Sequence, residues 1–167
     1  AAMRGSLGLE PNQKVLLYVG RLSLEKGLQT LLEAVLPLLK KDSNLKLCLV
    51  GDGPMRADIL ATAKAGGLDA SLIFAGFQED PSVYYAMADL FVLPSYEEGM
   101  SNALLEAMAS GLAVVATGVG AAQEMLGDDY ALATPRESES LRGQIESRLE
   151  MLSKGEDAGA PLQQRCE

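Results

Sequence analysis

Short apolar segments alternate with helical patterns along most of the chain, and this alternation is the strongest constraint on its fold. Strands are expected over residues 14–19, 45–50, 72–75, 90–93 and 113–116, with a sixth over 130–133. Continuous apolar strands are typical of a parallel sheet that is covered by helices on both faces. The pattern therefore predicts an α/β fold with a doubly wound, Rossmann-like parallel sheet. A closed barrel would need eight such units, more than the chain contains.

Helices are expected between these strands. Leucines at helical spacing, together with capping residues, indicate helices over 28–41, 55–65, 81–87, 102–109, 121–126 and 137–152. Pro37 lies inside the first of them and is expected to kink or end it. The pattern fails near the end of the chain, so we expect residues 154–167 to be a frayed or truncated end of a single domain.

Composition excludes several classes of function. The 167 residues are 48% apolar and contain no apolar run long enough for a transmembrane helix. A net charge of −9 argues against non-specific nucleic-acid binding. The absence of histidine excludes a Ser-His-Asp triad and histidine-ligated metals. Cys48 fits a small core residue, and without a disulfide framework the chain fits a reducing cytoplasm.

Ligands of such sheets bind outside the carboxyl ends of the strands, so the segments that follow strands carry most information. The first is Gly20-Arg21-Leu22-Ser23-Leu24-Glu25-Lys26-Gly27. Gly20 permits a sharp turn, and Arg21 and Lys26 place two cations beside a helix start, where anions are favoured. The residues alone leave open a diphosphate clamp or an exposed loop with ordinary surface charges.

This loop is neither of two common phosphate-binding motifs. No G-x-G-x-x-G opens the helix, and no acidic residue ends the second strand, so a dinucleotide fingerprint is absent. A P-loop would read G-x-x-x-x-G-K-S/T, which also does not occur here. A nicotinamide dehydrogenase is therefore a remote alternative.

The ends of the second and third strands give weaker signals. Glycines in Gly51-Asp52-Gly53-Pro54 permit close backbone approach to a flat ligand, although the favoured interpretation is an ordinary strand-to-helix turn. Phe77 follows Gly76 after the third strand and either lines a nucleobase slot or packs in the core.

The segment after the fourth strand, from Pro94 to Ala107, is the most informative. Ser101 is suited to cap the following helix, and the amides from Gly99 to Asn102 would form a second anion-binding end that faces the first loop. Glu98 and Glu106 bracket the turn, and carboxylates accept hydrogen bonds from vicinal sugar hydroxyls. The alternative is a solvated helix face. The apolar neighbours of Glu106 favour a site role, because a buried carboxylate needs a partner.

Taken in order, these segments resemble the C-terminal domain of the retaining glycosyltransferases known as group 1 or family 4, which have the GT-B fold. The resemblance covers about residues 14–135. It rests on V-G-R-L-S-x-E-K-G at 19–27, V-G-D-G-P at 50–54, F-x-G at 74–76, E-x7-E at 98–106 and A-M-A-S-G-L-A-V-V-A-T at 107–117.

The resemblance implies roles for these residues. Arg21 and Lys26 would bind the donor diphosphate and stabilise the leaving group, Glu98 would hold hydroxyls of the donor sugar, and Glu106 would hold the ribose. No metal or other cofactor is expected, because cationic side chains and helix ends replace it. The implied donor-binding residues are Gly20, Gly53, Phe77, Gly99, Met100, Ser101, Asn102 and Glu106.

Some positions depart from the family pattern. Ala113 replaces a common proline, and Gly118-Val119-Gly120-Ala121 replaces the usual Gly-Gly turn before Glu124, which puts the fine donor geometry in doubt. Nothing resembles the family's N-terminal acceptor domain or its closing C-terminal helix. We therefore expect this fragment alone to be inactive.

The implied partners are a nucleotide-sugar donor and an acceptor sugar or lipid-linked glycan, the acceptor being held by the missing domain. The cysteine usage fits a cytoplasmic protein, and the resemblance implies that any peripheral association with the inner face of the membrane would lie in that other domain. Two alternatives stay open. One is another GT-B enzyme, such as a nucleotide-sugar epimerase or a sugar phosphorylase, and the other is a non-catalytic nucleotide-binding domain.

Overall fold

The centre of the molecule is a sheet of five parallel strands. The structure is a computed structural model that describes residues 2–156 and 159–166. The spatial order of the strands is β3-β2-β1-β4-β5. Their bounds are β1 (Lys14–Val19), β2 (Leu45–Val50), β3 (Leu72–Gly76), β4 (Leu90–Leu93) and β5 (Ala113–Ala116). The predicted Rossmann-like α/β class is thus confirmed.

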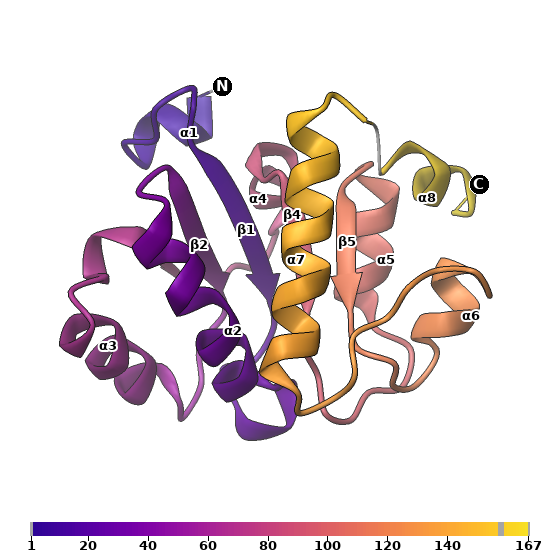
Figure 1. Cartoon of the computed structure of the whole chain (residues 1–167), viewed down its shortest axis with the longest axis horizontal. Coiled ribbons are helices and arrows are strands. Elements are labelled where there is room, and N and C mark those ends of the chain that lie inside the picture. The colour runs from indigo at the N-terminus through magenta and orange to yellow at the C-terminus, as the bar shows by residue number, and fades with distance from the viewer. Residues whose placement is uncertain (1, 157–158, 167) are drawn as a thin grey trace.

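Helices cover both faces of this sheet (Figure 1). The helices α2 and α7 pack side by side over one face together with α3, and α4 and α5 lie on the other face with α6 and α8. The helical elements are α1 (Ala2–Ser6), η1 (Leu24–Lys26), α2 (Leu28–Lys41), α3 (Arg56–Ala65), η2 (Asp69–Ser71), α4 (Ser82–Met87), α5 (Asn102–Ala109), α6 (Ala122–Leu126), α7 (Ser138–Ser153) and α8 (Ala160–Gln164).

The central strand explains why the strand segments are apolar throughout. Leu16 and Tyr18 of β1 pack into the layer that contains α2 and α7, while Val15 and Leu17 pack into the layer that contains α4 and α5. All four side chains are fully buried. Because both faces are covered, no position in the middle of β1 can be polar without losing burial energy.

The direction in which successive strands are added to the sheet reverses between β1 and β4. The chain runs outward from β1 through β2 to β3 and then returns to place β4 on the other side of β1. Ligands of open parallel sheets bind at such a reversal, outside the carboxyl ends of the strands. These ends lie along the lower edge of the molecule in Figure 1. The topology thus selects the loops after β1 and β4 as the place to look for a site.

Pro37 does not end its helix, one of the two outcomes expected there, and the predicted bounds 28–41 are confirmed. Helix α2 continues to Lys41, although proline provides no N–H for the carbonyl of Glu33 one turn earlier. Arg142 of α7 replaces that donor. Its guanidinium donates to the carbonyl oxygens of Glu33 and Ala34, each at 3.0 Å.

Arg142 should therefore contribute to stability through α2. Replacing it with methionine removes both donors and should lower the free energy of unfolding by about 1–2 kcal/mol, measured by urea denaturation. Pro37→Ala restores the backbone N–H, so the same Arg142→Met change should cost clearly less in that background. Equal losses in the two backgrounds would contradict this account.

Two other expectations differ from the structure. Residues 130–133 form no strand: only Ala133 makes a bridge, to Thr117, because the Tyr130 N–H donates to Gly127 in the turn after α6 and its hydroxyl donates to Val114. In the expected frayed end, the described residues include α8, where Leu162 is buried and Gln163 donates to Ala109 at 3.0 Å. One buried leucine in a five-residue helix is too weak a pattern to recognise.

Candidate functional site

The loop after β1 folds back onto the strand that leads into it. The Tyr18 hydroxyl donates to the carbonyl oxygen of Arg21 at 2.7 Å. Gly20 has a φ of 154°, and a Cβ at this position would lie 2.8 Å from the Tyr18 hydroxyl oxygen. The sharp turn therefore requires glycine, as predicted, and it leaves the Arg21 side chain exposed at the edge of the sheet.

This loop also contacts the loop after β4. Gly27, between η1 and α2, has a φ of 74°, and a Cβ there would lie 1.9 Å from the carbonyl oxygen of Pro94. The backbone N–H of Tyr96 donates to the carbonyl oxygen of Glu25 at 2.9 Å. Two segments far apart in the sequence are thereby fixed against each other at the reversal of the sheet.

Lys26 and Glu98 meet where these loops touch. The Lys26 Nζ lies 3.0 Å from Oε2 and 3.2 Å from Oε1 of Glu98. The Ser95 hydroxyl donates to the same carboxylate at 2.9 Å. The side chains of Lys26 and Glu98 are 28% and 13% exposed, so solvent screens this ion pair only in part. The structure thus brings two of the three predicted catalytic side chains into direct contact.

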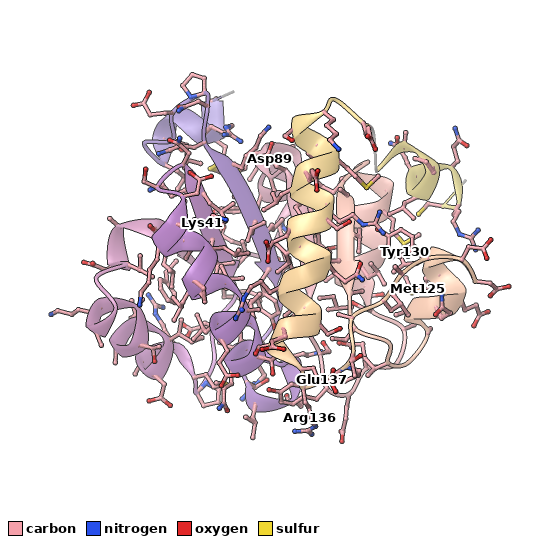
Figure 2. The ribbon with its side chains drawn as sticks, viewed as in Figure 1. Lys41, Asp89, Met125, Tyr130, Arg136 and Glu137 are labelled. Atoms are coloured by element: carbon pink, nitrogen blue, oxygen red, sulfur yellow. The ribbon has the colours of Figure 1, made fainter. Side chains whose placement is uncertain are left out.

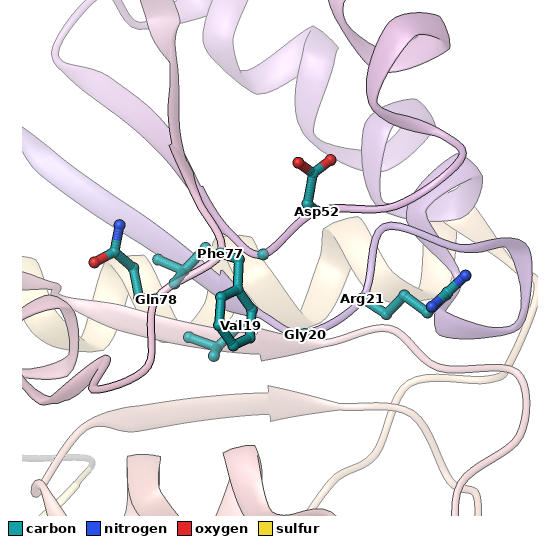
Figure 3. Close-up of a pocket in the computed structure, with 8 residues that line it drawn as sticks. Val19, Gly20, Arg21, Asp52, Phe77 and Gln78 are labelled. Carbon is teal, nitrogen blue, oxygen red and sulfur yellow. The ribbon is translucent and has the colours of Figure 1, made fainter.

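A pocket of about 310 Å³ opens beside Arg21, at the carboxyl ends of β1, β2 and β3. Phe77 lines it and is 77% exposed, so the alternative in which Phe77 packs in the core is wrong. In Figure 3, Arg21 and Gln78 lie on opposite sides of the Phe77 ring. The lining residues are Val19, Gly20, Arg21, Val50, Gly51, Asp52, Phe77 and Gln78.

The glycines after β2 allow backbone segments to approach each other closely around this pocket. A Cβ at Gly51 would lie 1.8 Å from the carbonyl oxygen of Gly20, and one at Gly53 would lie 2.5 Å from that of Leu22. The backbone at Gly53 therefore lies close to the loop after β1, where the sequence suggested a close approach to a ligand. Gly53 is absent from the pocket lining, and its donor-binding role remains a prediction.

Ser101 caps α5 as predicted. Its hydroxyl oxygen accepts a hydrogen bond from the Leu104 N–H at 3.1 Å, and the Ser101 side chain is buried. The neighbouring Gly99, Met100 and Asn102 are exposed, and Met100 is 69% exposed despite its apolar side chain. The helix start therefore lies open to solvent beside the Lys26–Glu98 pair.

Glu106 is exposed, not buried among its leucine neighbours, yet it has a partner. The hydroxyl of Tyr85, on α4, donates to its Oε2 at 2.8 Å. Both residues line a second pocket of about 270 Å³. Glu106 thus lies apart from the Arg21 pocket, on the side of α4 and α5.

Several residues at these sites were not anticipated from the sequence. Gln78 could have been found, because it directly follows Phe77 at a strand end. The hydrogen bonds from Ser95 to Glu98 and from Tyr85 to Glu106 could not be recognised from the local sequence. For Tyr85 the partner lies 21 positions away on a separate helix.

The buried Tyr18 phenol lies beneath this cluster. Burial, and then the charges of Glu98 and Glu25, raise the pKa of Tyr18 well above its ordinary value. The neutral phenol is therefore the form that the folded protein favours, and it can hold the Arg21 carbonyl up to alkaline pH.

The Tyr18 pKa predicts a loss of stability at alkaline pH. A group whose folded-state pKa is raised contributes its stability fully below the unfolded pKa, here about 10, and loses it as pH rises towards the folded value. Thermal melts should therefore show Tm falling above about pH 10, and Tyr18→Phe should flatten that fall while costing about 1 kcal/mol at neutral pH. An unchanged slope in the variant would contradict the assignment.

Neither a candidate metal site nor a membrane-spanning helix is found in the part of the chain that the structure describes. Within residues 2–156 and 159–166, no three His, Cys, Asp or Glu side chains are grouped so that they could hold a metal ion. None of the helices in that part of the chain is long and apolar enough to cross a membrane. The expectation that no metal takes part remains a prediction.

Known proteins are similar to this chain in sequence and in structure. The family described as "Glycosyl transferases group 1" matches residues 13–151. The chain is 36% identical over 118 residues to the alpha-monoglucosyldiacylglycerol synthase of Streptococcus pneumoniae, a match that covers 70% of the chain and 27% of that enzyme.

Two solved structures extend the comparison. Alr3699/HepE of Anabaena, in complex with UDP, matches with a TM-score of 0.86 and 28% identity over 99% of this chain and 46% of that one. The C-terminal domain of a group 1 glycosyl transferase, LpcC of Francisella tularensis, matches with a TM-score of 0.84 and 25% identity over 98% of this chain and 89% of that one. The chain thus spans less than half of the longer relatives and most of the isolated domain.

Proposed function

The chain belongs to the group 1 glycosyl transferases, and we propose that it is the domain of such an enzyme that binds the nucleoside diphosphate sugar. The observation that carries the proposal is the Lys26–Glu98 pair at the reversal of the sheet, beside the open pocket that Arg21 lines. A cation held beside an exposed helix start suits a diphosphate, and a carboxylate beside it suits sugar hydroxyls.

The proposed donor lies across the carboxyl edge of the sheet. Arg21 and Lys26 hold the diphosphate, and Glu98 and the backbone of residues 99–102 hold the sugar. The base lies against Phe77, and Glu106 holds the ribose. Residues of the segment that follows β3 line both pockets, Phe77 and Gln78 in the first and residues 80–82 in the second, which suits an extended ligand of this kind.

In the proposed reaction, a hexosyl unit passes to an acceptor hydroxyl with retention at the anomeric carbon. That carbon exchanges its bond to a diphosphate oxygen for a bond to the acceptor oxygen, and the acceptor proton is released. Negative charge develops on the departing diphosphate, where the positive charges of Arg21 and Lys26 stabilise it. Because these cations supply that stabilisation, the proposal includes no resident metal.

The acceptor belongs to a part of the enzyme outside this chain. The chain spans 27% of the Streptococcus pneumoniae synthase and 46% of the Anabaena protein. We therefore place the acceptor, a sugar or a lipid-linked glycan, on residues beyond those present here, and we expect this chain alone to bind donor without efficient transfer.

Calorimetric titration with UDP, GDP and ADP, with NAD as the control, tests the proposal. One diphosphate should bind selectively, with no change when EDTA is added, and binding should be lost in Lys26→Ala and weakened in Glu106→Ala. Binding of NAD in preference to every diphosphate would overturn the proposal. Failure of all three diphosphates to bind both this chain and the longer enzyme would do the same.

A further inference from the structure

Arg136 has an unusual backbone conformation. Its φ is 66°, and among the residues that the structure describes it is the only non-glycine residue with a positive φ. An L-residue with a long side chain in the left-handed region is strained, and such strain persists where surrounding contacts enforce it. Arg136 lies in the turn before α7, near the carboxyl edge of the sheet (Figure 2).

The contact that accompanies this strain is with Tyr96. The guanidinium carbon of Arg136 lies 4.2 Å from the centre of the Tyr96 ring. Across the described chain, the Arg136 side chain makes no hydrogen bond and no ion pair. The Glu137 N–H donates to the Thr134 carbonyl oxygen at 3.3 Å and closes the turn around the Arg136 backbone. The guanidinium itself is placed by the cation–π contact with the Tyr96 ring.

Tyr96 in turn joins the two loops of the site. It stands two positions before Glu98, and its N–H donates to the Glu25 carbonyl oxygen, directly before Lys26. The Tyr96 hydroxyl forms a 2.6 Å hydrogen bond with the buried Thr30 hydroxyl of α2. Its ring also lies against Gly27, where a Cβ would be 3.3 Å from the ring atom Cε1.

We propose that Arg136 is a positioning residue for donor binding, which acts by holding Tyr96 between the loops that carry Lys26 and Glu98. Arg136 covers the ring from the solvent side, and Thr30 and Gly27 confine it from α2. With the ring fixed, the Tyr96–Glu25 hydrogen bond keeps Lys26 at the distance from Glu98 that the site requires. The position of Tyr96 between the two loops follows from these contacts alone, whereas the effect of Arg136 on donor binding rests on the proposed function.

The strain makes the proposal testable with a matched pair of variants. Arg136→Asn relieves the strain, because asparagine tolerates the left-handed region, and it removes the cation. Arg136→Lys keeps the strain and a cation above the ring. A merely structural arginine would leave the ligand site unchanged in both variants as long as the protein stays folded.

The first measurement is hydrogen exchange of the Tyr96 amide by NMR in the ligand-free chain, which does not depend on the proposed function. Arg136→Asn should exchange this amide several times faster without a fall in Tm, and Arg136→Lys should restore the slow rate. Unchanged exchange in Arg136→Asn would overturn the proposal.

The second measurement is the Kd for UDP, or for GDP or ADP if one of these is selected in the titration above. Arg136→Asn should weaken binding by about two- to fivefold, corresponding to the loss of one cation–π contact. The change should disappear in a Tyr96→Leu background, because both residues act through the same contact. An equal loss in that background would mean that Arg136 acts independently of Tyr96, and would overturn the proposal. If wild-type protein binds none of the nucleotides, the proposed function fails while the exchange measurement still decides the geometry.

Discussion

Replacing Lys26 with alanine should weaken binding of the preferred nucleoside diphosphate by about a hundredfold or more, equivalent to about 3 kcal/mol. The change removes a charge-assisted hydrogen bond to the diphosphate. It also leaves the Glu98 carboxylate, 13% exposed, without its cation and facing the incoming phosphates. Because removing one partner of a partly buried pair leaves the other charge uncompensated, the loss should exceed that of an exposed contact.

Calorimetry of three matched variants separates these causes. Lys14→Ala removes another lysine that pairs with a carboxylate, at 3.6 Å from Asp89 and at the amino end of β1, and should leave the Kd unchanged. Glu98→Gln frees Lys26 from its carboxylate and should strengthen binding of the free diphosphate while lowering sugar transfer by the longer enzyme. Near-normal diphosphate binding by Lys26→Ala would contradict the assignment of Lys26.

Arg21→Ala should lower the turnover of the longer enzyme by orders of magnitude, as Lys26→Ala should.

The second large effect is expected at Gly27. Gly27→Ala should lower the free energy of unfolding by about 3 kcal/mol or more, because it combines left-handed strain with a steric clash. The new Cβ would lie 1.9 Å from the Pro94 carbonyl oxygen, so one of the two loops must move. Urea denaturation measures the loss, and diphosphate binding should fall with it, because the same movement separates Lys26 from Glu98.

Gly67 provides the matched control for the strain alone. Its φ of 68° is close to that of Gly27, but a Cβ there would meet no atom within 4 Å. Gly67→Ala should therefore cost only about 1–2 kcal/mol and leave diphosphate binding intact. If the two variants were equally stable, contact between the loops would not be the reason for glycine at position 27.

The placement of the site could be predicted from the sequence, whereas its contacts could not. Arg21, Lys26 and Glu98 follow apolar strands, and parallel strands bring their carboxyl ends to one edge. The direct Lys26–Glu98 contact depends on β4 lying next to β1. That neighbourhood is a property of strand order, which no local pattern encodes.

The differences at Pro37 and at residues 130–133 depend on side-chain contacts that the apolar pattern of the sequence does not show. Pro37 was expected to kink or end its helix because the sequence gives no sign that Arg142, more than a hundred positions later, supplies the missing donor. Residues 130–133 have the composition of a strand, but the contacts of Tyr130 hold them in a turn. For Phe77 the sequence left two alternatives open, a nucleobase slot or the core, and the exposure of its side chain decides against the core.

The strand order also has a consequence for the order of events during synthesis. The strands β1, β2 and β3 can pair as soon as residue 76 has been made, but the opposite edge of β1 stays open until β4 arrives. Lys26 and Glu98, 72 positions apart, meet only then. Contacts between distant segments form slowly, and an open strand edge invites association with other chains. The proposed nucleotide site can consequently form only after β4 has been made, and a ribosome stalled before β4 would present a lasting risk of aggregation.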